Sequence, residues 1–294
     1  MKIRFTLIEL VVVISIIASL LGITMFSINM AKSKAKYTKW LAYNTMLNKD
    51  PDTVINFNFS DTEAKINATS SLGTKSTQNL WPALMNNAVA CNIQGFELTQ
   101  THGIIKNAVW IKRGGRNRFH NALYFDGIKS YVEIPNSEAI NFNPETTDFT
   151  ILCWVKFDSL KSSRVICGKA EWNTTAQYTL YLNRNRLEAD VGRQCKGWKS
   201  PAITSGEWYH IALVSESGNF QIYLNGNPMT NPVKGSSSTK YETTAPFIIG
   251  AVMTSSNKTT PRYYFKGSID EFILIRKALK PSEVKHHFDA GNYK

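Results

Sequence analysis

An apolar run near the N-terminus constrains this chain more than any other feature of its sequence. It extends from Leu10 to Ile28 and contains no charged residue. At a rise of about 1.5 Å per residue, a helix of this length crosses the roughly 30 Å hydrocarbon core of a bilayer. Because Lys2 and Arg4 precede the run, we expect a short cytoplasmic N-terminus and export of everything after Lys32.

A secretory signal and a plain membrane anchor are the two simpler interpretations of this run. A signal peptide has about 7 to 15 apolar residues followed by small residues at a cleavage site. This run is longer and ends in Met25-Phe26-Ser27-Ile28-Asn29-Met30. A plain anchor does not explain Glu9, because a charge at helix depth costs about 2.5 to 3.5 kcal/mol on insertion scales. The sequence therefore favours a helix with a role beyond anchoring.

The start of the chain resembles the class III leader and processing site of type IV pilins and type II secretion pseudopilins, on the residues Phe5-Thr6-Leu7-Ile8-Glu9-Leu10. The resemblance implies that residues 1–4 are a leader, that prepilin peptidase cuts between Arg4 and Phe5, and that Phe5 is then methylated. The family usually has Gly before the cleaved bond, where this chain has Arg4.

The resemblance also implies that Glu9 directs assembly. A carboxylate near a membrane is tolerated when it meets a partner charge, and the α-ammonium of a neighbouring subunit would supply one. The local alternative is a capping box, in which Thr6 and Glu9 satisfy backbone amides at the start of the helix. The two roles are compatible.

We expect the helix to continue past the membrane. Residues 31–48 contain no Gly or Pro, and Tyr37, Trp40 and Leu47 recur at helical spacing. Asp50-Pro51 should end the helix. The prediction is a helix over residues 5–50, with residues 5–28 in the membrane. Four lysines just beyond the membrane should face solvent or lipid headgroups: Lys32, Lys34, Lys36 and Lys39.

After Pro51 the spacing of apolar residues changes to a period near two, which is typical of strands. The runs expected to form strands are 54–59, 108–112, 122–125, 131–134, 149–157, 164–168, 178–182, 186–191, 208–215, 220–224, 247–249, 264–266 and 269–275. The polar segment 64–79 should be a surface loop. Many short strands joined by turns such as Asn225-Gly226 predict an antiparallel sandwich or barrel.

Three groups of motifs resemble the laminin G-like domain of the concanavalin A-like lectins and glucanases. They are Asn121–Ile134 with Asp148–Val155, Gly206–Val214 with Gln221–Gly226, and Phe265–Phe272 with Arg276–Val284. The resemblance covers residues 53–294 and implies a mainly β chain, with an antiparallel β-sandwich of the jelly-roll type following the N-terminal helix. One fold hosts many activities, so the resemblance is weak evidence for function.

The sequence does not indicate an enzyme. Retaining glucanases of this fold carry acids in a Glu-x-Asp-x-x-Glu pattern, and the nearest match considered is Asp270-Glu271, whose side chains should face opposite sides of a strand. There is no Gly-x-Ser-x-Gly elbow, His-Glu-x-x-His motif or phosphate-binding glycine loop. The net charge is +12, yet no nucleic-acid-binding motif is present, so no specific nucleic-acid partner is expected.

Two kinds of binding site are expected. Relatives often bind calcium, and Asp126 and Asp270 lie in motifs near the two ends of the domain, so they are candidate calcium ligands. Lys129-Ser130 stands where relatives often have another acid. The alternative role for both aspartates is the capping of turns. Trp172 and Trp198 lie in polar stretches and are candidates for stacking on carbohydrate, with core packing as the alternative.

Other side chains are expected to be structural. Trp154, Trp208 and Phe272 are predicted to lie in the core, and His210 to be a buried sheet residue. A last helix should run from Ser282, its N-cap, to Phe288, with His286-His287 at its exposed end. None of the four cysteines forms a Cys-x-x-Cys pair. In an exported body they could form up to two disulfides, or stay buried as thiols: Cys91, Cys153, Cys167 and Cys195.

Two functions remain open from the sequence. The first is a pilin- or pseudopilin-like subunit, held in a bacterial inner membrane, that assembles with its own kind and displays a lectin-like domain in the periplasm or outside the cell. The second is a monomeric, membrane-anchored module that binds glycans or proteins. Glu9 and the helical pattern beyond the membrane favour the first, because a simple tether needs neither.

Overall fold

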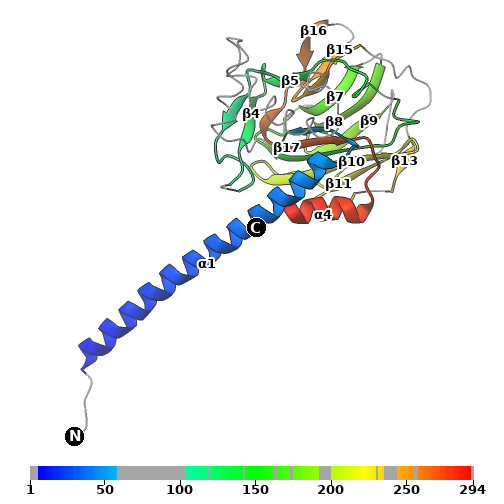
Figure 1. The fold of residues 1–294 in the computed structure, drawn as a ribbon. Helices are drawn as coiled ribbons and strands as arrows, with labels where there is room; N and C mark the ends of the chain where they lie inside the picture. Colours follow the sequence, from blue (N-terminus) through cyan, green and yellow to red (C-terminus); the bar gives the residue numbers. More distant parts are fainter. Residues whose placement is uncertain are drawn as a thin grey trace, which may run out of the picture.

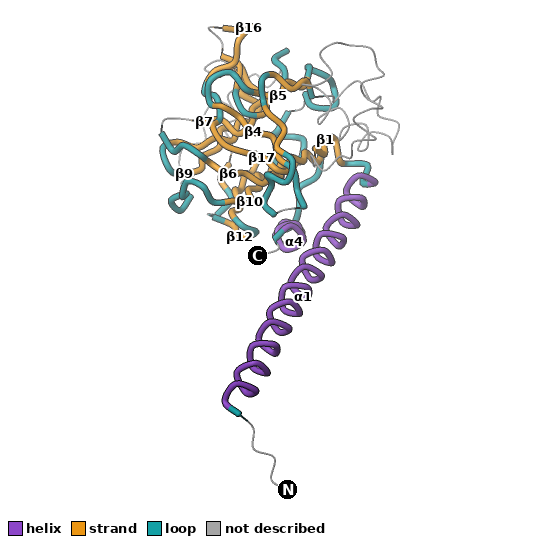
Figure 2. The backbone as a smooth tube through the Cα atoms, turned by 90° about the vertical axis from the view of Figure 1, so that its left-hand side faces the viewer, coloured by secondary structure: helices purple, strands orange, loops and turns teal. Residues whose placement is uncertain are grey.

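The computed structural model consists of a long N-terminal helix joined to a β-sandwich (Figure 1). It describes residues 6–57, 103–117, 119–141, 143–161, 164–172, 175–191, 200–229, 231–234, 244–254 and 257–292. Helix α1 spans Leu7–Lys49, and its N-terminal part projects away from the sandwich. The short C-terminal helix α4, Pro281–Gly291, lies beside the other end of α1 (Figure 2). The predicted fold, a long helix followed by a mainly β domain, is confirmed.

Both ends of α1 form as their local sequence predicts. At the start, Thr6 Oγ1 accepts a hydrogen bond from the backbone N–H of Glu9 at 3.3 Å, and Glu9 Oε2 accepts one from the N–H of Thr6 at 2.8 Å. This is the expected capping box. At the other end, Asp50 caps the helix and Pro51 follows, so the predicted boundary is correct.

The N-terminal half of α1 is uncovered. All its large apolar side chains from Leu7 to Ile28 are exposed, with values from 45% at Val13 to 79% at Leu7. The helix is long and apolar enough to cross a membrane. Because so much contiguous apolar surface is unstable in water, lipid or other protein must cover it.

The sandwich contains two sheets, mostly antiparallel. Sheet A has the order β12 (Asn227–Pro228), β11 (Asn219–Leu224), β10 (Trp208–Glu216), β6 (Phe149–Phe157), β17 (Lys266–Ile275), β4 (Ala122–Asp126) and β3 (Val109–Ile111), with β1 (Thr53–Phe57) paired to β17 and β13 (Val233–Lys234) paired to β11. Sheet B has the order β16 (Asn257–Arg262), β15 (Val252–Thr254), β7 (Arg164–Trp172), β14 (Phe247–Ile249), β5 (Tyr131–Ile134) and β2 (Ile104–Lys106), with β8 (Thr175–Asn183) paired to β7 and β9 (Arg186–Val191) paired to β8.

The core lies between the two sheets and is formed by alternate residues of their strands. Phe272 of sheet A and Phe247 of sheet B meet there with ring centroids 5.7 Å apart, and both are fully buried. Phe272 is thus a core residue, as predicted. Trp154 is also buried but lies on the outer face of sheet A, where its ring stacks on Phe288 of α4 at 5.7 Å.

Strand β17 holds the two ends of the domain together. One edge pairs with β6 along its length; the other pairs with β4 at Lys266–Ile269 and with β1 at Phe272–Ile275. Since β1 follows α1 directly, the helix enters the sandwich beside its last strand. This topology places α1 over the outer face of sheet A.

A β-bulge in β17 overturns one expectation. Ile269 is opposite Val155, but the next pair is Glu271 with Trp154, so β17 contains one extra residue there. Ile269 and Phe272 both face the core. Asp270 and Glu271 between them therefore both face outward, although they were expected on opposite sides.

Helix α4 differs from its prediction in where it begins and in the burial of one histidine. It begins at Pro281 with Lys280 as the N-cap residue, not at Ser282. His286 is exposed as expected, but His287 is only 1% exposed. The reason is helical periodicity: His287 lies one turn after Val284, which is fully buried against sheet A, so both belong to the packed face.

Candidate functional site

The C-terminal part of α1 docks on sheet A through aromatic and polar side chains. Trp40 is fully buried and Asn44 is 1% exposed. The Trp40 ring contacts His120 edge-on at 4.2 Å between centroids, and Tyr37 stacks on Phe119 at 5.4 Å. The helical spacing of Tyr37 and Trp40 found in the sequence therefore marks the docking face of α1.

Beneath this helix lies a buried group of polar residues that we call the junction cluster: Asn44, Arg116, His120, Asp270, Glu271 and His287. Its centre is Arg116, from the loop between β3 and β4. Arg116 Nη1 lies 2.9 Å from Asp270 Oδ1, and Nη2 lies 3.3 Å from Glu271 Oε2. Its Nε donates to the carbonyl oxygen of Gly291 in α4 at 2.9 Å. One side chain thus links the last strand to the last helix.

Arg116 is held in place from several directions. Its guanidinium carbon lies 5.2 Å from the Trp40 ring centroid and 4.9 Å from that of Trp154, within the range of cation–π attraction. Its backbone N–H donates to Asp270 Oδ2 at 2.8 Å. The preceding Gly115 permits this approach, because a Cβ atom there would lie only 2.7 Å from Asp270 Oδ2 and 2.8 Å from the carbonyl of Asn121.

The two carboxylates have different electrostatics. Burial raises the pKa of Asp270, but the charges of Arg116 and His120 outweigh burial and hold it below its usual value. Burial raises the pKa of Glu271 to about 7, against the opposing effect of Arg116. One guanidinium cannot neutralise two buried carboxylates, so the second one gains a proton more easily.

Glu271 connects the helix to the sandwich. Asn44 Nδ2 donates to Glu271 Oε1 at 3.0 Å, and the Asn56 side chain of β1 donates to Asn44 Oδ1 at 3.3 Å. On the other side, His287 Nε2 lies 4.0 Å from Glu271 Oε1. Helices α1 and α4 therefore both contact the same carboxylate.

Two histidines extend the cluster into sheet A. His210 Nε2 lies 2.9 Å from His287 Nδ1, so one ring donates a hydrogen bond and the other accepts it. Burial, together with the charge of Arg116, lowers the pKa of His287 to about 3. The prediction that His210 is a buried sheet residue is confirmed. The buried contacts of the junction cluster fix the orientation of α1. At its edge, Arg116 also borders a small pocket of about 100 Å³ between Trp154, Trp208 and the end of α4.

Asp126 and Asp270, the predicted calcium ligands, have separate partners. Asp126 Oδ1 accepts hydrogen bonds from the N–H groups of Ile128, Lys129 and Ser130 at 2.8 to 3.1 Å, which is turn capping. Asp270 is bound by Arg116 and His120. Within the described ranges, no three His, Cys, Asp or Glu side chains form a group that could hold a metal. The two aspartates do not fit a shared calcium site.

Several predicted residues fall outside the described part of the chain. They are Arg4, Phe5, Cys91, Cys195, Trp198 and the side chain of Trp172, whose backbone ends β7. Glu9 lies at the exposed start of α1. Cys153 and Cys167 are buried free thiols, which agrees with one of the two alternatives left open by the sequence.

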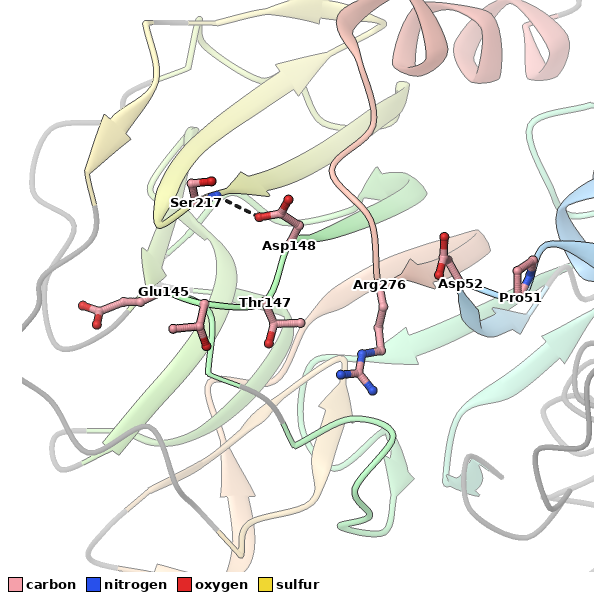
Figure 3. Close-up of a pocket in the computed structure, with 8 residues that line it drawn as sticks. Pro51, Asp52, Glu145, Thr147, Asp148, Ser217 and Arg276 are labelled. Atoms are coloured by element: carbon pink, nitrogen blue, oxygen red, sulfur yellow. Dashed lines mark hydrogen bonds between the residues drawn. The ribbon is translucent and has the colours of Figure 1, made fainter.

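An open polar pocket lies where the chain passes from α1 into β1. It has a volume of about 660 Å³, and Asp52, Glu145, Asp148, Ser217 and Arg276 line it. Figure 3 shows the Asp148 carboxylate turned toward Ser217, whose N–H donates to it at 2.8 Å. The Arg276 N–H donates to the carbonyl of Asp52 at 2.7 Å. The Asp148 carboxylate therefore stabilises the turn at Ser217, and the Arg276 N–H fixes the chain at Asp52, where it enters β1.

The comparison with protein families identifies the sandwich. Residues 126–285, more than half of the chain, match the laminin G family model of the concanavalin A-like lectin/glucanases superfamily. The chain belongs to this superfamily. The match confirms that the sandwich resembles a laminin G-like domain. The matched residues do not include α1 or β1. No curated protein matches the chain.

Several solved structures of other proteins resemble this one at low identity. A Trypanosoma rangeli sialidase with 2,3-difluorosialic acid has a TM-score of 0.46 at 15% identity, over 66% of this chain and 33% of its own. The binding domain of Paraclostridial Mosquitocidal Protein 1 has a TM-score of 0.49 at 17% identity, over 65% of this chain and 48% of its own. A structure of botulinum neurotoxin type C, a toxin whose cell entry depends on two ganglioside molecules, has a TM-score of 0.45 at 14% identity, over 66% of this chain and 47% of its own. The chain thus spans less than half of each.

Proposed function

We propose that this protein is a structural subunit that assembles through α1, as type IV pilins and pseudopilins do, and displays its laminin G-like sandwich as a lectin-like binding head. The observation that supports this most is the difference between the two parts of α1. Residues 7–28 are uncovered, whereas Trp40 and Asn44 are buried against sheet A. One helix therefore offers an apolar surface and holds the head at a fixed orientation to it.

The continuity of α1 favours assembly over simple tethering. The helix runs without a break for 43 residues, or about 65 Å, so roughly half of it extends beyond a bilayer core. A tether works with a flexible linker and needs no buried contacts. A stacked assembly requires each head to keep one orientation, which the junction cluster would provide.

Glu9 is the residue we assign to assembly. It lies at the start of the uncovered segment, where its carboxylate already caps the helix through Thr6. In a stack of helices, the same carboxylate would meet the new α-ammonium of Phe5 in a neighbouring copy. Cleavage after Arg4 by a prepilin peptidase, insertion in a bacterial inner membrane and a periplasmic or extracellular head belong to this proposal.

Two substitutions separate the charge of Glu9 from its capping role. Glu9→Gln keeps an oxygen that accepts from Thr6 N–H but removes the charge, so we expect loss of assembly with membrane insertion unchanged. Thr6→Ala weakens the cap and keeps the charge, so assembly should persist. Electron microscopy and membrane fractionation give the two readouts. Filaments formed by Glu9→Gln would contradict the assembly role and favour a monomeric membrane-anchored module, which the length of α1 also permits.

We also propose that the head binds ligands and does not cleave them. Asp270 and Glu271, the pair of acids compared with the glucanase pattern, are buried under α1 and paired with Arg116. Binding of the full-length protein in detergent to a glycan array, weakened by Trp172→Ala or Trp198→Ala, would support a lectin. Release of reducing sugar from bound glycans would contradict a purely binding role.

A further inference from the structure

The outer face of sheet B carries two acids whose hydrogen-bond partners, in the part of the chain that the structure describes, are neutral donors. Glu188 and Asp190 are two positions apart on β9, so both side chains lie on the same face of the strand. Leu187, Ala189 and Val191, which alternate with them, face the core. Both acids are partly exposed, so a ligand can reach them.

A tyrosine hydroxyl lies between the two carboxylates. Tyr181 Oη is 3.1 Å from Oε2 of Glu188 and 3.3 Å from Oδ1 of Asp190. Asn183 Nδ2 lies 3.3 Å from both carboxylate oxygens of Glu188. Burial raises the pKa of Asp190 to about 6; the charge of Glu188 adds to this, and the Tyr181 hydrogen bond opposes it. Among the described residues, no positive group forms an ion pair with either carboxylate, so the site holds negative charge there.

A buried hydroxyl beside these acids also lacks a partner. Thr179 is directly opposite Asp190 in the β8–β9 register, which places both side chains on the same face. It is 1% exposed, and its Oγ1 makes no hydrogen bond. A buried unsatisfied polar group costs about 1 to 3 kcal/mol. The face of β8 and β9 that carries the two acids thus also holds an unsatisfied hydroxyl.

We propose that this β8–β9 acidic site, formed by Thr179, Tyr181, Asn183, Glu188 and Asp190, binds a glycan that carries free amino groups. An ammonium group supplies the missing positive charge, and sugar hydroxyls supply donors and acceptors for the tyrosine, threonine and amide. An anionic glycan such as a sialylated one would be repelled by the two carboxylates. The inference rests on the lectin-like role proposed for the head.

The test is titration calorimetry on the full-length protein in detergent at pH 7. The probes are a glucosamine hexamer, its N-acetylated form, sialyllactose and calcium chloride. We expect the amine-bearing hexamer to bind, and Glu188→Gln and Asp190→Asn each to weaken it at least tenfold. Glu133→Gln, the same change elsewhere on sheet B, should have no effect. Because the protein carries a net charge of +12, non-specific attraction of a cationic sugar is disfavoured.

The pH dependence gives an independent readout. Between pH 7 and pH 5 the sugar amines gain protons in every measurement, but only a protein with Asp190 loses a carboxylate charge. The tenfold higher affinity of the wild type over Asp190→Asn at pH 7 should therefore be largely lost at pH 5. No binding by the wild type, or equal binding by the two acid variants and Glu133→Gln, would overturn the proposal. Calcium binding that both acid variants lose, without hexamer binding, would assign the site to a cation instead. Binding of the head to other glycans on the array, unchanged in both acid variants, would keep the lectin-like role and reject this site, so the two proposals fail separately.

Discussion

Asn44 of the N-terminal helix donates a hydrogen bond of 3.0 Å to the carboxylate of Glu271, which lies 227 positions later in the last strand. Both residues are buried. Because α1 also presents the uncovered segment 7–28, this contact links the surface proposed for assembly to the orientation of the head. Disturbing it should change the attachment of the head without changing the apolar segment.

The first prediction concerns Asn44. Asn44→Leu removes the donor and leaves the Glu271 carboxylate without this hydrogen bond, so we expect a loss of about 1 to 3 kcal/mol in the free energy of unfolding of the head. Thr45→Ala is the matched control, since the exposed Thr45 hydroxyl bonds only to the carbonyl of Leu41 in its own helix. Urea unfolding in detergent gives both values. Equal stability of the two variants would show that the contact does not hold the helix.

The second prediction concerns Arg116. Arg116→Met removes the only cation that contacts both Asp270 and Glu271 in the described structure, so we expect a loss of about 3 to 5 kcal/mol. Arg262→Met changes an exposed arginine of β16 and should cost under about 0.5 kcal/mol. A thermal-shift series compares the variants. A melting temperature for Arg116→Met near that of Arg262→Met would contradict the central position of Arg116.

The third prediction concerns pH. The pKa of Glu271 is about 7 in the folded protein, above its ordinary value of 4.5, so the folded state binds more protons between these pH values. Its contribution to stability is present below pH 4.5 and is lost as the pH rises through 7. Glu271→Gln cannot ionise, so its stability relative to the wild type should increase from pH 5 to pH 8. A difference that stays constant or decreases would contradict the buried, proton-binding carboxylate.

His287 has the opposite effect on how stability depends on pH. Its pKa is about 3 when folded and 6.5 ordinarily, so the unfolded chain binds more protons between these values. Stability should therefore fall as the pH decreases from 6.5, and His120 and His210, whose pKa values are also lowered by burial, act in the same direction. His287→Gln should reduce this loss, as measured by urea unfolding at pH 4.5 and 7. His286→Gln, at the exposed neighbour, is the control.

The fourth prediction concerns the thiols. Cys153 and Cys167 are fully buried, and burial raises the pKa of both. In a Cys91→Ser/Cys195→Ser variant, a thiol reagent should label neither residue until the protein is unfolded. Rapid labelling of the folded variant would show that the core is open at β6 and β7.

The elements with strong periodicity could be predicted from the sequence. Strands β5, β6, β9 and β14 have the predicted bounds, because alternating or continuous apolar runs between turn residues define them. The end of α1 followed from Pro51. In contrast, β2, β12, β13, β15 and β16 were not predicted, since they are two to six residues long with little apolar pattern of their own. Their positions depend on pairing with neighbouring strands.

The junction cluster could not be predicted, for three physical reasons. Arg116 lies in a polar loop, and only the fold brings it under α1. The β-bulge that turns Asp270 and Glu271 to one face leaves no mark in the pattern of apolar residues. The burial of His287 depends on the helix that covers it. Glu188 and Asp190 could have been found, since the predicted strand 186–191 already places them together on its polar face.

Photo-crosslinking in the membrane tests directly whether copies of this chain assemble through α1. A benzoylphenylalanine placed at Ile17, which is 50% exposed in the middle of the uncovered segment, traps whatever lies against α1. If the chain assembles through α1, irradiation should give a ladder of covalent multimers of this chain, and the ladder should be lost when Glu9→Gln is added. Crosslinking to lipid alone, with the protein remaining monomeric at all expression levels, would contradict assembly through α1.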